Sequence, residues 1–504
     1  ATAIQSERLS SINPATGEVI GTVPNQTAAD VDAAVARARV ASATWSTRSF
    51  AARNEELDAF RRALAAEADT LADLLHRENG KPEVEALTEV MMSLGHLKHA
   101  VGRAEKVLAT KKVSPGLLAN FRATISYHPL GVIGVIGPWN FPINTPMGSI
   151  AYALAAGNAV VWKPSELTPL IALEIAKIAA RTFALPDLLQ VVTGGGATGA
   201  ALAKSAVDKI SFTGSAATGK RVMQAAAERL TPVLMELGGK DAMIITEDAN
   251  LEKAAEAAVY GALSNAGQAC VAIERIYVSD AIHDAFVDEV VKQVKELKVG
   301  GDDAHISAMT SDAQVKIVRD HLEDAVAKGA KVHTGGPAAI SGSYIQPTVL
   351  TNVTHDMKVM TDETFGPVIP IQKVKSVDEA VKLANDSRYG LGSSVWGKKG
   401  VSAIADKIRA GMTSVNSVLA FAGIYGLPFG GIGESGFGRI HGDEGLKEFS
   451  RVKATAEQRF ALPMNPMSFR QPEGQPKQLR GMIKTLYGDG IVSKAGDLLR
   501  KLTQ

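Results

Sequence analysis

Between residues 131 and 236, short apolar segments alternate regularly with segments of helical character. The run GVIGVIG at 131–137 is β-branched and bounded by glycine, which is typical of a strand buried on both faces of a sheet. This alternation predicts right-handed βαβ units and a doubly wound parallel sheet, which binds ligands beyond the carboxyl ends of its strands. We predict further strands at 159–161, 189–192, 209–212 and 233–236, separated by helices near 147–156, 169–183, 198–205 and 215–228.

The segments on either side of this region differ in character. Residues 51–108 are rich in Ala, Leu and Glu and predict long helices, and residues 241–433 predict a second α/β domain. Residues 461–478 contain four prolines and predict an extended linker, and residues 479–503 place apolar residues at helical spacing between lysines and arginines. In the second α/β domain we expect helices near 249–265, 280–297, 311–328 and 376–386, and a strand at 275–278.

The composition excludes several classes of protein. The 504 residues include 54 Lys and Arg against 53 Asp and Glu, so no overall field favours nucleic acid, and we expect no nucleic-acid partner. A single cysteine excludes an intramolecular disulfide, a cysteine-based zinc site and an iron–sulfur cluster, and we expect no metal. The first residues lack the basic start and apolar run of a signal peptide, which favours a cytoplasmic protein. An uncharged stretch at 129–162 is interrupted by prolines, so we expect no transmembrane segment.

Two glycine-rich segments resemble nucleotide-binding loops. Residues 194–199 match G-x-G-x-x-G, but no acidic residue follows at the spacing of about 20 residues expected for a ribose partner. Residues 214–220 match the start of a P-loop, but Arg221 stands where Ser or Thr should ligate magnesium, which argues against phosphoryl transfer. Phe212–Ser215 is still a strand end that runs into a helix N-terminus, where free N–H groups favour an anion.

The only cysteine, Cys270, has two interpretations. A lone cysteine is commonly an inert buried residue. However, Glu236 follows a predicted strand and precedes a glycine pair, and a thiol with a carboxylate can form a nucleophile and general base. A carboxylate in apolar surroundings would have the raised pKa that a base working near neutrality requires.

Seven motifs then occur in order along the chain, and together they resemble the NAD(P)-dependent aldehyde dehydrogenase superfamily. The likeness runs from about Asn13 to about Phe460, and some of it is to succinate-semialdehyde dehydrogenase-type members. The motifs are Gly137-Pro138-Trp139-Asn140-Phe141-Pro142, Lys163-Pro164-Ser165-Glu166, Phe212-Thr213-Gly214-Ser215, Glu236-Leu237-Gly238-Gly239-Lys240, Gly267-Gln268-Ala269-Cys270, Glu363-Thr364-Phe365-Gly366-Pro367 and Pro428-Phe429-Gly430-Gly431.

The resemblance implies a division of the chain. It implies a Rossmann-like NAD-binding domain at 1–109 and 129–240 and a catalytic domain at 241–445. A small β oligomerisation element would comprise 110–128 and 446–460, which implies a homodimer or homotetramer. Residues 461–504 form a C-terminal extension outside the common pattern; its basic helix would cover the substrate tunnel, lie on a membrane surface or pack on a neighbouring subunit.

The resemblance also implies catalytic roles. Cys270 would attack an aldehyde as the thiolate, and the Cys270 N–H with the Asn140 amide would stabilise the oxyanion. Glu236 would activate the water that hydrolyses the thioester.

For the cofactor, Lys163 and Glu166 match residues that hold the adenosine ribose, and Ser215 would face the pyrophosphate. A carboxylate that accepts from the 2′-hydroxyl repels a 2′-phosphate, so Glu166 favours NAD over NADP. Glu363 and Phe365 match the pair that lies at the nicotinamide ribose and ring. The remaining expected cofactor contacts are Ile136, Gly137, Pro138, Trp139, Phe212, Gly214 and Leu237.

The substrate is less constrained. Members that recognise a substrate carboxylate often carry arginines where this chain has Gly148 and Ser264, so we favour an apolar aliphatic or aromatic aldehyde. Gly148 should widen the tunnel, with Phe141, Phe421 and Tyr425 as further liners. Succinate semialdehyde remains the alternative substrate; a CoA-acylating enzyme and a non-catalytic nucleotide-binding scaffold are more remote, because Glu236, Cys270 and Asn140 are all present.

Overall fold

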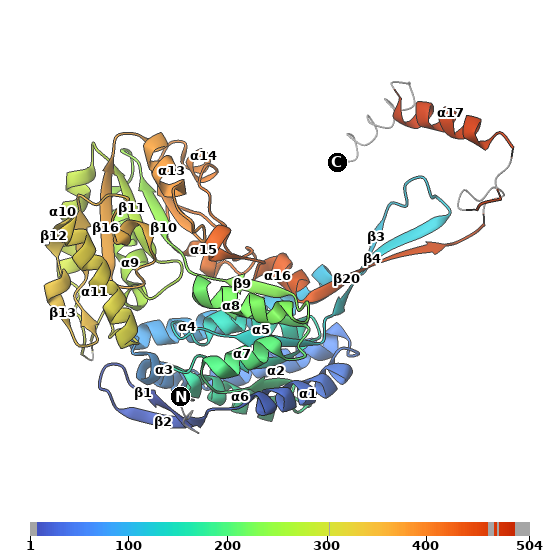
Figure 1. The fold of residues 1–504 in the computed structure, drawn as a ribbon, viewed down its shortest axis with the longest axis horizontal. Coiled ribbons are helices and arrows are strands. Elements are labelled where there is room, and N and C mark those ends of the chain that lie inside the picture. The colour runs from blue at the N-terminus through green and yellow to red at the C-terminus, as the bar shows by residue number, and fades with distance from the viewer. Residues whose placement is uncertain (1–7, 302, 462–467, 471–472, 489–504) are drawn as a thin grey trace. The chain divides into compact units, whose positions relative to one another are not determined.

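The computed structural model describes residues 8–301, 303–461, 468–470 and 473–488. The chain divides into two compact units (Figure 1). The larger comprises residues 1–109 and 127–452, and the smaller comprises residues 110–126 and 453–504.

The larger unit contains the predicted doubly wound sheet. Five of its six strands are parallel, and their order is β19-β9-β8-β5-β6-β7, with β19 antiparallel at the edge. The strands predicted from the sequence are confirmed to within one or two residues at their ends. They are β5 (Val132–Ile136), β6 (Ala159–Lys163), β7 (Leu189–Val191), β8 (Lys209–Thr213) and β9 (Val233–Glu236), connected through α5 (Asn144–Ala155), α6 (Pro169–Thr182), α7 (Gly196–Lys204) and α8 (Ala216–Ala227).

Helices cover this sheet on both faces, since every residue of β5 and β6 is buried. The N-terminal segment supplies much of the cover. Its Trp45 is fully buried and donates from Nε1 to the Leu154 carbonyl oxygen at 2.9 Å, which ties the first helix to α5. The N-terminal elements are β1 (Arg8–Ile12), β2 (Val19–Pro24), α1 (Ala28–Trp45), α2 (Phe50–Ala66), α3 (Ala68–Asn79) and α4 (Glu83–Leu108).

The second α/β domain is also present in the larger unit, with its own core. Its sheet has the order β12-β15-β16-β11-β10-β17-β18, and only β12 is antiparallel. Its strands are β10 (Asp241–Ile245), β11 (Ile273–Ser279), β12 (Lys331–Thr334), β15 (Thr348–Thr351), β16 (Val368–Val374), β17 (Ser393–Trp396) and β18 (Ser414–Val415). Its helices include α9 (Leu251–Leu263), α10 (His283–Lys295), α11 (Asp312–Ala327), α12 (Lys358–Thr361), α13 (Val377–Asn385) and α14 (Val401–Ala405), and short elements are η1 (Ser264–Gly267), η2 (Pro337–Ala339), β13 (Ile340–Ser341) and β14 (Tyr344–Ile345).

The end of the expected catalytic domain differs from the sequence prediction. After α15 (Ala420–Gly423) and η3 (Gly433–Ser435), strand β19 (Gly436–Phe437) pairs with β9 of the first sheet, and α16 (Gly442–Glu448) packs on α4. Phe429, Ile440 and Leu446 belong to the first hydrophobic core. The chain therefore returns to the domain of the first sheet well before residue 445, where the catalytic domain was expected to end.

The smaller unit centres on a three-stranded sheet of order β20-β4-β3. Its strands are β3 (Lys111–Val113), β4 (Phe121–Pro129) and β20 (Ser450–Gln458), in the segments expected for an oligomerisation element. Helix α17 (Gln475–Tyr487) begins within the segment expected to be a linker, and most of the expected helix at 479–503 lies outside the described residues. In the described part of the chain, no helix combines the length and apolar character needed to cross a bilayer.

Candidate active site

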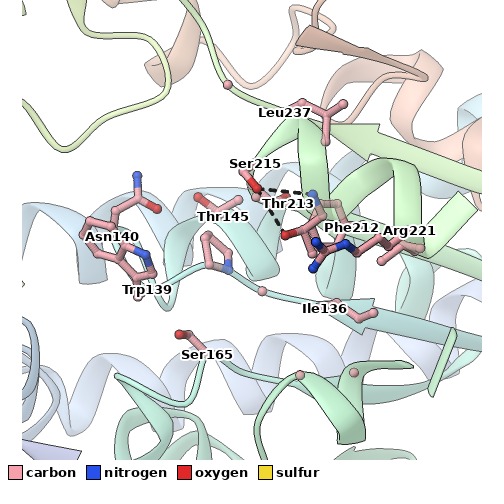
Figure 2. Close-up of a pocket in the computed structure, with 18 of the residues that line it drawn as sticks. Ile136, Trp139, Asn140, Thr145, Ser165, Phe212, Thr213, Ser215, Arg221 and Leu237 are labelled. Carbon is pink, nitrogen blue, oxygen red and sulfur yellow. Dashed lines mark hydrogen bonds between the residues drawn. The ribbon is translucent and has the colours of Figure 1, made fainter. Parts of the chain in front are cut away.

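A pocket of about 560 Å³ opens at the carboxyl ends of β5, β6 and β8 (Figure 2). Its position is the one that the strand–helix alternation predicted. Asn140 and Cys270 line it together with every residue expected to contact the cofactor, which are Ile136, Gly137, Pro138, Trp139, Lys163, Glu166, Phe212, Gly214, Ser215, Leu237, Glu363 and Phe365. The volume and mixed polar and apolar wall fit a dinucleotide.

One side of the pocket is built from the turns that follow β6 and β8. Ser215 lines the pocket (Figure 2) and caps α8 by accepting a hydrogen bond from the Thr218 N–H at 3.3 Å, so this helix N-terminus, a position that favours an anion, lies at the pocket. Lys163 is buried, and its Nζ lies 3.4 Å from Glu166 Oε2. Burial lowers the pKa of Lys163, and Glu166 opposes this shift.

Several wall residues were not predicted as cofactor contacts. Gly196 and Gly199 at the start of α7 line the pocket, although no acidic residue follows this glycine run at the spacing of the dinucleotide fingerprint. Ser165 and Arg221 also line it (Figure 2). Two features of the sequence could have indicated some of these contacts. They are the glycine-rich run at 194–199 and Arg221, the cation that follows the P-loop-like segment.

The loop that carries Glu363 and Phe365 is fixed by a buried acid from β11. Glu274 accepts hydrogen bonds from the Thr364 N–H at 2.7 Å and the Phe365 N–H at 2.8 Å. Its Oε2 also accepts from Lys240 Nζ at 2.6 Å. The loop then presents Phe365 edge-to-face with Trp139, with ring centroids 5.4 Å apart, and both rings line the pocket.

The glycine pair between Glu236 and Lys240 permits two close approaches. A Cβ on Gly239 would lie 2.2 Å from the Cys270 carbonyl oxygen, and a Cβ on Gly238 would lie 2.3 Å from Glu363 Oε2. The Gly239 N–H donates to Glu363 Oε1 at 2.8 Å. The backbone of this motif therefore brings the nucleophile candidate and the ribose-side carboxylate to the same strand end.

The turn before Cys270 is held in a strained conformation. Asn265, Ala266 and Gly267 have φ values of 52°, 55° and 73°, three successive residues in the left-handed region. Gln268 stabilises the turn by donating from Nε2 to the Asn265 carbonyl oxygen at 3.0 Å and accepting at Oε1 from the Thr310 N–H at 2.9 Å. Cys270 comes three residues after Gly267 and is half-buried at the pocket wall.

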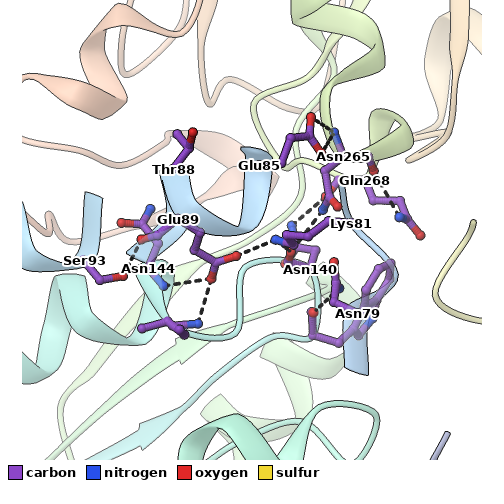
Figure 3. A network of polar contacts seen from close by, with 12 residues as sticks. Asn79, Lys81, Glu85, Thr88, Glu89, Ser93, Asn140, Asn144, Asn265 and Gln268 are labelled. Carbon is purple, nitrogen blue, oxygen red and sulfur yellow. Dashed lines mark hydrogen bonds and ion pairs between the residues drawn. The ribbon is translucent and has the colours of Figure 1, made fainter. Parts of the chain in front are cut away.

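A buried polar network positions Asn140 (Figure 3). Asn140 Nδ2 donates to the Gln268 carbonyl oxygen at 2.9 Å, and Lys81 Nζ donates to the Asn140 carbonyl oxygen at 2.9 Å. Lys81 also forms a buried ion pair with Glu89, whose Oε1 accepts from the Asn144 N–H at 3.0 Å. Lys81 and Glu89 lie outside the motifs recognised in the sequence, although Lys81 holds the Asn140 backbone and Glu89 holds the backbone that follows it.

Glu236 lies at the end of β9, 2% exposed, and the next two residues of the chain, Leu237 and Gly238, line the pocket. Burial raises the pKa of Glu236 to about 8, with Arg439 opposing this shift and Asp241 adding to it. Burial raises the pKa of the Cys270 thiol well above its usual value, and the nearby carboxylates of Glu236 and Glu363 add to this shift. The thiol is therefore held protonated next to a carboxyl group that titrates near neutral pH.

The expected tunnel residues do not line this pocket. Phe141 packs under Lys81, whose Nζ lies 4.4 Å from the ring centroid. The Tyr425 ring covers Gly95, with its centroid 4.9 Å from that of His96, and buried Phe421 packs on Phe429.

The expectation that Gly148 widens a tunnel is wrong in this structure. A Cβ at this position would lie 3.2 Å from Ile440 Cδ1 and 3.4 Å from His441 Nε2. The side chains of Ile440 and His441 therefore occupy the space next to Gly148.

Comparison with known proteins identifies the family. The model described as "Aldehyde dehydrogenase family" matches residues 2–455. The chain belongs to this family. The family assignment confirms the resemblance seen in the seven motifs and makes the chain an oxidoreductase of the aldehyde dehydrogenase type.

Relatives of several kinds resemble the chain. It is 39% identical to the 4,4'-diapolycopene aldehyde oxidase of Methylomonas sp, covering 97% of this chain and 93% of that protein. It is also 39% identical to a putative succinate-semialdehyde dehydrogenase [NADP(+)] 2 of Mycobacterium ulcerans, covering 94% and 92%. The solved NAD-dependent aldehyde dehydrogenase of Sinorhizobium meliloti superposes with a TM-score of 0.88 at 32% identity, covering 93% and 94%. These matches confirm the predicted α/β Rossmann-like fold.

Proposed function

We propose that this aldehyde dehydrogenase oxidises an apolar aldehyde to the carboxylic acid with NAD as the hydride acceptor. One observation carries the proposal. Cys270 and Asn140 line the same pocket as the residues expected to contact the cofactor, and Glu236 is buried in the chain segment that adjoins this pocket. This combination supplies a nucleophile, an oxyanion donor and a base beside one cofactor-sized space.

The reaction begins at the Cys270 sulfur. Ionised Glu236 takes the thiol proton, and the thiolate forms a bond to the aldehyde carbon. The oxyanion is stabilised by the Cys270 N–H and the Asn140 amide. Since an amide carries two N–H groups, the bond from Asn140 to the Gln268 carbonyl oxygen leaves one for the oxyanion.

NAD, held by the residues named above, supplies an acceptor for the hydride that leaves the thiohemiacetal carbon. The product of that loss is a thioester on Cys270. Glu236 first releases to solvent the proton that it took from the thiol. It then removes a proton from water as the water oxygen bonds to the thioester carbonyl carbon. The carbon–sulfur bond breaks, and the leaving thiolate takes that proton back from Glu236, which gives the carboxylic acid and the Cys270 thiol. The buried position of Glu236 suits this role, because its pKa of about 8 allows it to accept and return protons near neutrality.

The cofactor preference rests on Glu166. Its carboxylate is half-exposed at the pocket rim beside Lys163, where it would accept from a 2′-hydroxyl and repel a 2′-phosphate. NADP is the second candidate, because Arg221 lines the same pocket and the mycobacterial relative is named as NADP-dependent.

The substrate preference rests on Gly148 and Ser264, the positions at which family members that recognise a substrate carboxylate often carry arginine. Without a guanidinium at either position, a buried substrate carboxylate would lack a cation, which disfavours succinate semialdehyde. The Methylomonas relative, named for a diapolycopene aldehyde, supports an apolar substrate.

The decisive experiment compares wild type with Cys270→Ser and Glu236→Gln, using hexanal, decanal, benzaldehyde and succinate semialdehyde with NAD or NADP. We expect Cys270→Ser to abolish NADH formation. Glu236→Gln should retain a stoichiometric burst when the thiol is ionised at high pH but lose steady turnover, because the thioester is no longer hydrolysed. Wild-type kcat should rise with pH up to about 8, as Glu236 ionises.

The panel also tests the alternatives. A strong preference for succinate semialdehyde would overturn the apolar assignment, and a preference for NADP would overturn the role of Glu166. Turnover that requires CoA would indicate an acylating enzyme, and no NADH with any aldehyde would indicate a non-catalytic scaffold.

A further inference from the structure

Helix α17 in the C-terminal extension has a continuous exposed apolar face. Leu479, Met482, Ile483 and Tyr487 are 46%, 49%, 58% and 71% exposed. Since each residue of an α-helix turns by about 100°, these four side chains fall within one arc of about 140°. This apolar face runs from Leu479 to Tyr487, the last residue of the helix.

The cations of α17 border the apolar face on one side. Arg480, Lys484 and Lys477 follow it at roughly 100°, 140° and 160° from Leu479, and α17 contains no acidic residue. Residues 461–504 hold seven Lys and Arg against three Asp and Glu, out of 54 and 53 in the whole chain, so the remainder is net negative. The near-neutral total charge therefore conceals a basic C-terminal extension.

We propose that α17 binds the surface of an anionic lipid bilayer, with its apolar face in the headgroup–acyl boundary. The cations beside that face complement lipid phosphates, and their long stems allow them to reach the headgroups while the apolar side chains are buried. Tyr487, the most exposed of the apolar residues, has the amphipathic ring that occurs at membrane interfaces. Thirteen residues are too few to span the bilayer, so the helix lies along it.

The charge pattern favours lipid over a second copy of the chain as the occupant. Outside the extension, the chain carries almost equal numbers of acids and bases, and it offers no strongly acidic total to match α17. An anionic bilayer supplies both required features, negative charge and an apolar layer, in one surface. This inference does not depend on the aldehyde chemistry.

The test is co-sedimentation of the full chain with phosphatidylcholine vesicles that contain either no or about 30 mol% phosphatidylglycerol, at about 0.1 M and 0.5 M NaCl. We expect binding to the anionic vesicles at least tenfold tighter than to neutral ones, weakened by salt. Ile483→Asp should reduce binding at least tenfold. Its matched control is Gln478→Asp, which adds the same charge to the same helix outside the apolar arc and should weaken binding far less.

Other outcomes would overturn the proposal. Equal binding of Ile483→Asp and Gln478→Asp would show that the apolar face does not enter lipid. No binding of wild type to anionic vesicles would also overturn it. If Ile483→Asp lowers the assembled mass in sedimentation velocity without lipid, the face is covered by a second copy instead. Circular dichroism and thermal melting of each variant verify folding without reference to turnover.

Discussion

At the scale of single residues, the site depends on a turn that the backbone would not adopt unaided. Three successive left-handed residues at 265–267 place Cys270, and two of them carry side chains. Each of the two residues that carry a side chain, Asn265 and Ala266, costs of order 1–3 kcal/mol in this conformation, so the surrounding contacts must hold the turn. Asn265 and Gln268 supply them: Asn265 Nδ2 donates to the Asn140 carbonyl oxygen at 3.0 Å, and Gln268 closes the turn. The strain is placed directly beside the nucleophile.

The first prediction concerns Asn140. Asn140→Ala should lower kcat by about 10²–10³-fold, because one oxyanion donor is lost. Asn140→Asp keeps the shape but replaces the donor with a carboxylate, and it should be at least as damaging. Steady-state kinetics with the best aldehyde from the panel measure both effects.

The accompanying control is nucleotide affinity. The dissociation constant for NAD should change less than kcat, because Asn140 contributes one amide to a long pocket wall. Wild-type kcat in Asn140→Ala would exclude the oxyanion role.

Sequence motifs predicted the residues that touch the pocket but not those that hold them in place. Cys270, Asn140 and Glu363 occur in short motifs whose chemistry can be recognised from the sequence alone. Nothing in the sequence marks Lys81 and Glu89 as buried, since long charged side chains are almost always exposed. Both are buried because they bond to backbone that lies more than fifty residues further along the chain.

At the scale of elements, ionisable side chains are buried at the junction between β9 and β10. Asp241, the first residue of β10, accepts at Oδ1 from the Gly392 N–H at 2.9 Å. Its Oδ2 is buried and has no hydrogen-bond partner among the described residues. Burial raises the pKa of Asp241 to about 8, so the carboxyl group is protonated at neutral pH.

The second prediction is that Asp241→Asn flattens the pH dependence of stability. The folded-state pKa is raised above the unfolded value, so the native state binds more protons, and its stability falls as pH rises toward 8. Removing this group should reduce the loss by up to about 1.4 kcal/mol per pH unit. Urea unfolding at pH 6 and pH 8 measures it.

Asp32→Asn on the exposed surface of α1 is the matched control and should leave the pH dependence as in wild type. Glu236 and Glu363, with pKa values also raised to about 8, retain part of the slope. An unchanged slope in Asp241→Asn would mean that this carboxyl group stays ionised in the fold.

Elements were predictable where local pattern and length agreed. The run at 131–137 predicted a buried strand, and the helix–strand alternation predicted parallel strands, but the order of the strands in the sheet came only from the structure. Strand β19 was not predictable, because it has two residues and pairs with β9 some 200 positions earlier in the chain. Helix α17 began earlier than expected because Pro476 is tolerated in the first turn of a helix.

At the scale of the whole molecule, β20 presents a long edge that pairs with no other strand among the residues that the structure describes. It has nine residues, eight of them exposed, and it is the outer strand of its three-stranded sheet. Exposed edges of this length pair with other chains unless they are blocked by proline, a bulge or a covering segment. Strand β20 carries charges at Arg451, Lys453 and Glu457. Val452 and Ala454 lie among these charges and provide apolar contacts on the edge.

The third prediction is that β20 assembles the protein into the homodimer or homotetramer implied by its sequence. Val452, 67% exposed, should be covered by a second copy, so Val452→Glu should lower the assembled mass. Val40→Glu on α1, where the side chain is 73% exposed, is the matched control and should retain the wild-type mass. Sedimentation velocity decides the matter, since a wild-type species of only 52.9 kDa would mean that the edge stays unpaired in solution.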